Sequence, residues 1–452
     1  MTADNKTNNQ TNNKAKNRLN HKAQFWLWML IFFGVGILVI SVSFVIMLFV
    51  DPQPVPVEPV MVMVPSPSPT PSPRPSPSPR PSPSPLPSPE PTPDPMEGLV
   101  HSNFNGLPIP EELEHLRPVA VVINNHSRAL PQSGISQAEI IYEALAEGSI
   151  TRLVAIFQQL NAIAIGPVRS TRDYYVDMAV ENDAVMVHHG GSPTGYTRLR
   201  NLGVPSLDGM ALEGTTFWRD PERRRVPALF EHSSFTNAER IEEAIERRNI
   251  RRYREEDDSL GFLFNHDEEL TFEDIARASG GNLRPCLKIT VPFSPAYPRR
   301  FVFNEERQMF AVYNVHGPHV DALLLLGDGE EYENGKEAAE NEDEIEETGQ
   351  VFVRNVLIQH VRSRVVDNVG RREFSTVDSG TGYLAVDGFI IDVRWQRDSV
   401  SSPTRWYFMN GEPMQLKPGQ IWINVLQNNV SIEVITGVEE ENEEQEEEEY
   451  GE

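Results

Sequence analysis

The chain of 452 residues contains a single cysteine, Cys286. An intramolecular disulfide is therefore excluded, and so is a zinc site built from several cysteines. Cys286 lies in an apolar, strand-like run, where a free cysteine usually packs as a small buried hydrophobic residue. The folded part of the chain is expected to depend on its hydrophobic core for stability.

Recognisable catalytic and nucleotide-binding motifs are also missing. The chain has no G-x-S-x-G elbow, no Walker loop, no H-E-x-x-H pair and no dinucleotide-binding fingerprint. His316, His319 and Asp321 have the spacing H-x-x-H-x-D, but the Gly-Pro between the histidines favours a turn held by polar side chains. We expect neither a metal nor a cofactor.

The net charge of −26 is concentrated in two acidic runs. The segment 328–347 holds eleven acidic residues and one lysine, and the segment 438–452 holds ten glutamates and no basic residue. Both runs are predicted to be disordered, the first as a surface loop and the second as a tail. No broad basic surface is evident in the rest, so nucleic acid is not an expected partner.

One long hydrophobic run is present near the N-terminus. Residues 25–50 carry no charge and are long enough to span a bilayer, with Trp26 and Trp28 at an interfacial position. Basic residues in 1–24 precede the run, which predicts a cytoplasmic N-terminus and an extracytoplasmic remainder. A cleaved signal peptide is the alternative, but no small-x-small cleavage pattern follows the run.

Residues 51–98 form a linker rich in proline and serine. From Pro65 to Pro95 every second residue is proline, which excludes a helix and favours an extended polyproline II stalk. At ~3.1 Å per residue this stalk could reach roughly 100 Å from the membrane. A tract recognised by proline-binding domains is the alternative.

Residues 99–284 alternate between predicted strands and helices, which is typical of an α/β domain with a mixed or parallel sheet and flanking helices. Strands are predicted at 117–126, 152–157 and 184–187. Helices are predicted at 136–147, 170–178, 237–248 and 271–278. The first of these would be capped by Ser136, with Glu139 three residues later.

Residues 285–437 are predicted to form a mostly β domain. Strand-like runs occur at 287–291, 300–303, 310–315, 351–359, 383–386, 390–395, 406–409 and 421–426. Asp387-Gly388 and Asn410-Gly411 fall between such runs and are strong hairpin signals.

The segment Ile165–Tyr175 is the first candidate for a binding site. It contains a Gly-Pro turn, Arg169 and Arg172, and a Ser170-x-x-Asp173 pattern typical of a helix start. Arginine is unfavourable at a helix N-terminus, because that end carries partial positive charge. A bound anion between the two arginines and free backbone N–H groups would explain them. Pairing with carboxylates elsewhere in the fold is the alternative.

Two further loops could join this segment. If the strands that precede them are parallel neighbours, all three loops meet at one sheet edge, where open α/β sheets bind ligands. A Gly-Gly-Ser loop can also cradle an anion with its N–H groups, although Gly and Asn are common turn formers as well. The residues of these two loops are Asn124, Asn125, Arg128, His189, Gly190, Gly191 and Ser192.

Asp173 and Glu143 are the candidates for acid–base catalysis. Asp173 could instead cap a helix. Glu139, Glu143 and Glu147 stand four residues apart, so on a helix they would line one face, and such a face is usually only solvated.

Several motifs resemble the YerB-like family of bacterial envelope lipoproteins. In the first half they are Arg117–Asn125, Pro131–Ser136, Ile140–Arg152, Ile165–Asp173 and His189–Pro193, and in the second Asn314–Asp321, Asn355–Ile358, Trp395, Ser402–Thr404 and Pro418–Ile423. The resemblance covers roughly 99–437 and implies an extracytoplasmic, membrane-tethered protein with an N-terminal domain of unknown function and its C-terminal partner. The lipoproteins use an acylated cysteine, whereas no cysteine lies near this N-terminus.

The sequence thus predicts a binding or scaffolding module of the cell envelope, anchored through residues 25–50. Its expected partner is an anionic ligand such as a wall polymer or lipid-linked glycan, or another envelope protein. An enzyme acting on phosphate-bearing envelope polymers is the alternative. The order Arg128, Arg152, Arg169, Arg172-Asp173 is similar to the arginine–aspartate pattern of the LytR-CpsA-Psr phosphotransferases.

Overall fold

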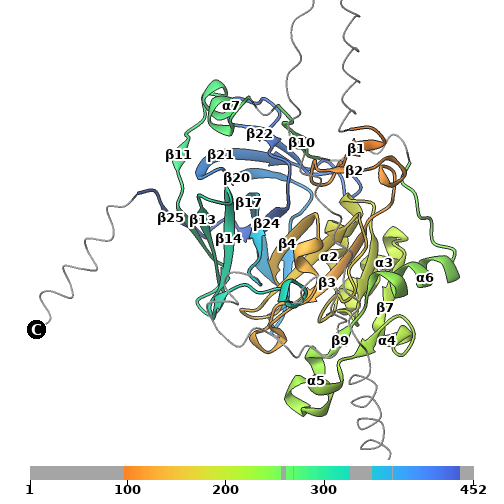
Figure 1. Cartoon of the computed structure of the whole chain (residues 1–452). Helices are drawn as coiled ribbons and strands as arrows, with labels where there is room; N and C mark the ends of the chain where they lie inside the picture. Colours follow the sequence, from red (N-terminus) through yellow and green to blue (C-terminus); the bar gives the residue numbers. More distant parts are fainter. Residues whose placement is uncertain (1–95, 256–260, 268, 326–348, 369, 438–452) are drawn as a thin grey trace, which may run out of the picture. The chain divides into compact units, whose positions relative to one another are not determined.

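The computed structural model describes residues 96–255, 261–267, 269–325, 349–368 and 370–437 (Figure 1). The described residues all belong to one unit of the chain, Glu90–Glu452. The predicted membrane span, residues 51–95 of the linker, and both predicted acidic segments lie outside the described residues. Among the described residues, no helix has the length and apolarity needed to cross a membrane.

An eleven-stranded mixed sheet forms the centre of the described part. Ten strands follow one path and β22 (Arg405–Phe408) pairs with β21 at its side. In spatial order the ten are β11 (Arg284–Pro285), β21 (Phe389–Gln396), β20 (Ser379–Val386), β17 (Asn355–Val361), β24 (Ile421–Gln427), β4 (Ile140–Leu145), β5 (Thr151–Phe157), β3 (Val119–Asn124), β6 (Val185–His188) and β7 (Ser206–Asp208).

The central strands are buried on both faces. Every residue of β3, β4, β5 and β6 is buried, which explains why β3, β5 and β6 read as mostly continuous apolar runs rather than as alternating patterns. The pairs β17–β24, β24–β4, β3–β6 and β6–β7 are parallel, whereas β4–β5 and β5–β3 are antiparallel. The sheet is therefore mixed.

A second, six-stranded sheet is built from the C-terminal half. It contains β15 (Gly317–Pro318), β14 (Met309–Asn314), β13 (Pro298–Asn304), β12 (Lys288–Pro292), β25 (Glu433–Ile435) and β16 (Phe352–Val353). Two-stranded pieces complete the β structure: β1 (Leu99–His101) with β2 (Pro108–Pro110), β8 (Trp218–Arg219) with β9 (Ser234–Phe235), β10 (Leu263–Phe264) with β23 (Gln415–Leu416), and β18 (Ser363–Val365) with β19 (Arg372–Phe374).

The predicted β character of this half is confirmed. Asp387 and Gly388 both have positive φ and join β20 to β21, as their hairpin signal predicts. Asn410 and Gly411 form a tight turn after β22.

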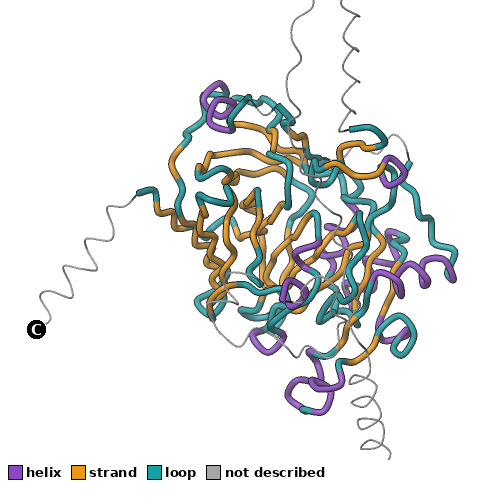
Figure 2. The backbone as a smooth tube through the Cα atoms, in the orientation of Figure 1, coloured by secondary structure: helices purple, strands orange, loops and turns teal. Residues whose placement is uncertain are grey.

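The helices are few and mostly lie around the strands from the first half (Figures 1 and 2). Those described are α2 (Asp173–Glu181), α3 (Pro193–Leu202), α4 (Gly209–Leu212), α5 (Pro221–Arg225), α6 (Ala238–Arg247) and α7 (Phe272–Ala278). Helix α2 packs on β3, β5 and β6 and against α3. Asn237 and Thr271 cap α6 and α7, close to the predicted starts.

The predicted helix at 136–147 is wrong. Residues Ile135–Gln137 form one 3₁₀ turn, and Ile140–Leu145 form strand β4, hydrogen-bonded between β24 and β5. Glu, Ala and Leu are good helix formers, but intrinsic propensity is a weak determinant of structure, and pairing on both sides in a buried sheet overrides it. Glu139 and Glu143 are therefore buried rather than placed on a solvated helix face.

The predicted helix start at Ser170 is also displaced. Helix α2 begins at Asp173, and its N-cap is Arg172, whose side chain makes no capping hydrogen bond. Ser170 instead donates its hydroxyl to the backbone oxygen of His189, 3.0 Å away.

Candidate functional site

Three loops come together at the carboxyl ends of β3 and β6. Because these strands are parallel neighbours, the residues that follow them lie at one edge of the sheet. The segment 165–172 crosses this edge, with the Arg169 N–H donating to Val122 and the Thr171 N–H donating to Gly190. In return, the His189 N–H donates to the oxygen of Arg169, at 3.0 Å. The predicted convergence of these loops is thus present in the structure.

A glycine lets the arginine-bearing segment approach its neighbour. Gly166 has φ +155, and a Cβ at this position would lie 2.8 Å from the ring of Phe235. Real Cβ atoms do not approach other atoms so closely, so a larger residue would push the segment away from β9. Its place beside β3 and β6 therefore depends on this glycine.

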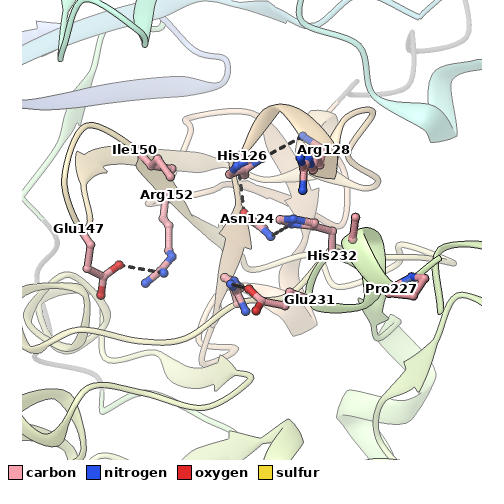
Figure 3. A pocket seen from close by; sticks show the side chains of 11 residues that line it. Asn124, His126, Arg128, Glu147, Ile150, Arg152, Pro227, Glu231 and His232 are labelled. Carbon is pink, nitrogen blue, oxygen red and sulfur yellow. Dashed lines mark hydrogen bonds and ion pairs between the residues drawn. The ribbon is translucent and has the colours of Figure 1, made fainter. Parts of the chain in front are cut away.

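A pocket of about 420 Å³ opens at this edge (Figure 3). Its volume is in the range of small-molecule sites. The lining residues are Asn124, His126, Arg128, Glu147, Ile150, Arg152, Arg169, Pro227, Ala228, Glu231 and His232. They come from the loop after β3, from β5 and the turn before it, from the segment 165–172, and from the 3₁₀ turn Pro227–His232.

Three arginines line the pocket in different ways. Arg152 is buried, binds Glu147 at 3.1 Å and donates to the oxygen of Ser170 at 2.9 Å. Arg169 is a quarter exposed and binds the exposed Glu231 at 2.5 Å. Arg128 is exposed and has no carboxylate partner among the residues that the structure describes. The lining therefore carries three positive charges and two negative ones.

The carboxylates of the pocket are ionised at neutral pH. Burial raises the pKa of Glu147, but the positive charges of Arg152 and Arg172 outweigh it and leave the pKa below its ordinary value. The hydrogen bond and the charge of Arg169 lower the pKa of Glu231. Because each of these carboxylates binds an arginine, they position the guanidinium groups at the pocket.

The histidines of the pocket are neutral at pH 7. Burial, followed by the neighbouring His126 ring and the positive charge of Arg169, lowers the pKa of His232 to about 4. Burial, followed by Arg128 and Arg169, lowers the pKa of His126. Asn124 joins the two, since its side chain bonds the His126 backbone at 3.1 Å and the His232 ring at 2.7 Å.

Arg172 does not line the pocket. It is buried at the start of α2, where its guanidinium binds Glu147 and the oxygen of Thr171. Arg172 therefore pairs with a carboxylate of the fold, which is the alternative given above for the two arginines. Arg169 also has a carboxylate partner, but it borders the pocket.

Asn125 and Glu143 belong to a buried network on the other side of β3. Asn125 donates to Glu143 at 3.0 Å and to Thr151 at 2.7 Å. Glu143 also accepts from Thr151, Arg299 and Trp422, and only 1% of its surface is exposed. A carboxylate so enclosed cannot touch a ligand in the pocket.

Asp173 is the first residue of α2 and does not line the pocket. Burial raises the pKa of its carboxyl group. Its position in the first turn matches the cap-like role considered above, where a negative charge offsets the partial positive charge of the helix end.

The loop His189–Ser192 lies beside the pocket but does not line it. His189 bonds Ser234 at 2.7 Å and Arg219 at 3.0 Å. The Gly190 N–H donates to Asp208, the Ser192 N–H donates to Thr171, and the Ser192 hydroxyl caps α3. Gly191 also forms a β-bridge with Thr171. The polar groups of this loop are therefore used in hydrogen bonds within the fold rather than in an anion-binding cradle.

Of the residues predicted from sequence, Asn124, Arg128 and Arg169 line the pocket, whereas Glu231 and His232 line it without having been predicted. These two lie in the turn Pro227–His232, where Glu231 follows Arg169 by 62 residues, and no motif marks them. In the neighbouring helix α5, Arg223 donates to the backbone oxygens of Ala129 and Pro131.

Two family models match the chain. The N-terminal domain of the protein family of unknown function DUF3048 matches residues 104–251, and the C-terminal domain of the same family matches residues 326–423. All of the residues that line the pocket lie within the first match.

A curated relative and a solved structure agree with this assignment. The chain is 29% identical over 325 residues to "Putative lipoprotein YerB" of Bacillus subtilis (strain 168), which covers 71% of this chain and 84% of the relative. The crystal structure of YerB protein from Bacillus subtilis matches with a TM-score of 0.57 and 26% identity, over 74% of this chain and 99% of the crystallised one. The chain therefore belongs to the YerB-like family, with the N- and C-terminal domains of DUF3048.

Proposed function

We propose that this protein is an envelope protein, anchored to the membrane through residues 25–50, that binds an anionic envelope ligand such as a wall polymer or lipid-linked glycan. One observation carries the binding proposal: three arginines border a single cavity whose lining has only two carboxylates. The relative from Bacillus subtilis is named as a lipoprotein, which supports a location at the cell envelope.

The pocket has the properties of an anion site. Arg128 has no carboxylate partner among the described residues, and Arg169 binds a carboxylate that is itself mostly exposed. An exposed ion pair of this kind contributes only about 0–1 kcal/mol, so an incoming anion can replace Glu231 at little cost. Arg152 adds a positive charge that burial shields from water.

Binding of a phosphate-bearing polymer tests the proposal. We expect the purified full-length chain to bind purified poly(glycerol phosphate), measured by calorimetry, and not to bind neutral dextran. Arg128→Gln and Arg169→Gln should each weaken binding about tenfold, because a hydrogen bond to a charged group contributes roughly 1.5–3 kcal/mol.

Arg277→Gln is the matched control, since Arg277 is about two-thirds exposed, pairs with Glu273 on helix α7 and does not line the pocket. It removes the same charge and should leave affinity unchanged. The proposal is wrong if both pocket variants bind as well as the unchanged chain. Release of glycerol phosphate from the polymer, with or without Mg²⁺, would instead support the enzymatic alternative.

A further inference from the structure

The side-chain amide of Asn124 has a fixed orientation. Its Oδ1 lies 3.1 Å from the backbone nitrogen of His126, which can only donate. The Nδ2 group must therefore be the one that faces Nδ1 of His232, 2.7 Å away. An amide group donates, so Nδ1 of His232 accepts and carries no proton. In a neutral ring the proton then resides on Nε2.

His126 is held in the same tautomer by the backbone. Its Nδ1 lies 3.0 Å from the backbone nitrogen of Arg128, which again can only donate. Nδ1 of His126 is thus an acceptor, and the ring proton is on Nε2. Burial keeps both rings neutral at pH 7, because it lowers their pKa values.

Both Nε2–H groups are available to a ligand. Neither Nε2 has a hydrogen-bond partner among the described residues, and neither is among the buried unpaired atoms, so both are open to solvent. The two rings lie 4.9 Å apart between centroids and both line the pocket (Figure 3). The pocket therefore offers two neutral N–H donors beside its arginines.

We propose that the anion recognised here is a phosphate group, held by the Nε2–H groups of His126 and His232 together with Arg152 and Arg169. This inference rests on the proposed anion-binding function and deepens it. A carboxylate has two oxygens in one plane, and one arginine fork can satisfy both. The donors of this pocket come from four separate segments, which suits the tetrahedral oxygens of a phosphodiester or pyrophosphate.

The tautomers can be observed directly by NMR. In the full-length chain labelled with ¹⁵N-histidine, we expect the two-bond ¹⁵N–¹H correlations of His126 and His232 at pH 7 to show Nε2 protonated and Nδ1 unprotonated. Inorganic pyrophosphate should shift the Nε2 signals of both rings. A proton on Nδ1 of either ring, or Nε2 signals that do not respond to bound pyrophosphate, would overturn the inference.

Two substitutions of His232 distinguish the roles of its two ring nitrogens. In His232→Gln the amide can occupy the place of Nε2–H, whereas in His232→Asn the shorter side chain reaches only the place of Nδ1. We expect pyrophosphate affinity within about threefold of the unchanged chain for His232→Gln and a loss of about tenfold for His232→Asn, which corresponds to about 1.4 kcal/mol. Equal affinity of both variants would overturn the role given to Nε2–H.

A comparison of two anionic polymers tests whether the pocket prefers phosphate to carboxylate, separately from whether it binds an anion at all. Poly(glycerol phosphate) should bind at least tenfold more tightly than polygalacturonate, a carboxylate polymer. Equal or tighter binding of polygalacturonate overturns the phosphate assignment and leaves the anion-binding function standing. If neither polymer nor pyrophosphate binds, the proposed function and this inference both fail.

Discussion

At the scale of single residues, neutral histidines make stability depend on pH. His232 has a pKa of about 4 in the folded chain, against an ordinary value of 6.5. Between these values the unfolded chain binds more protons than the folded one, so stability falls as pH decreases from about 6.5 toward 4. Above about pH 6.5 the ring is unprotonated in both the folded and the unfolded chain, so His232 no longer lowers the stability.

We therefore expect His232→Gln to reduce this dependence. The denaturant midpoint of the unchanged chain should fall more steeply between pH 7 and pH 5 than the midpoint of the variant, because glutamine does not titrate. Urea unfolding at several pH values measures both. Parallel pH profiles would show that His232 has no such role.

The pocket residues were only partly predictable from sequence, for reasons visible at this scale. Adjacent residues on a strand point to opposite faces, so Asn124 and Asn125 could not both reach one pocket. Asn124 does, and Asn125 bonds Glu143 instead. Arg169 and Arg172 were alike in sequence, yet the carboxylate that each would bind was set by contacts across the fold.

At the scale of elements, β4 is joined to the second sheet by a buried ion pair. Glu143 of β4 binds Nε of Arg299 of β13 at 2.8 Å, and both side chains are 2% exposed. Nη1 of Arg299 lies 2.6 Å from Nδ1 of His319, whose other nitrogen bonds Gln132. These polar groups satisfy one another where the two sheets meet.

Glu143→Ala should cost about 3–5 kcal/mol of unfolding free energy, because it leaves the charge of Arg299 buried and unpaired. Glu373→Ala removes the partner of Arg364 in an exposed pair and should cost about 1 kcal/mol or less. Urea unfolding of the two variants gives the comparison. Similar losses from both would contradict the importance assigned to the buried pair.

The same strand shows where sequence patterns fail. The strands β3, β5 and β6 were predictable, since each is a short apolar run followed by a turn signal. In β4, Tyr142, Glu143 and Ala144 interrupt the apolar pattern, and the acidic spacing imitates a helix. What identifies β4 as a strand is its pairing with β24, and a partner so distant in sequence leaves no local signal.

At the scale of the whole molecule, the two halves share one sheet and one core. β4 of the first half pairs with β24 of the second, and most of the buried hydrophobic residues in the described part belong to one cluster. Predicted domains 99–284 and 285–437 therefore contact each other through backbone hydrogen bonds as well as side chains. Composition revealed the change from mixed to β-rich character near residue 285, but it contained no information on this pairing.

We expect segments 96–284 and 285–437, produced separately, not to fold. Each would expose an unpaired central strand and half of the shared core. Chemical denaturation followed by tryptophan fluorescence should show a cooperative transition for the full-length chain and none for either segment. A cooperative transition of the isolated first segment would contradict this expectation.

The pairing of β4 with β24 also has a consequence during synthesis. Ile140 is the partner of Ile421, so a ribosome must complete nearly the whole described part before β4 acquires its second neighbour. Contacts between such distant positions form slowly, because a long loop has to close first. Until then the nascent chain presents a bare apolar strand, which is a target for aggregation and for chaperones. A cell that makes this protein has to protect its first half from aggregation until β24 has been synthesised.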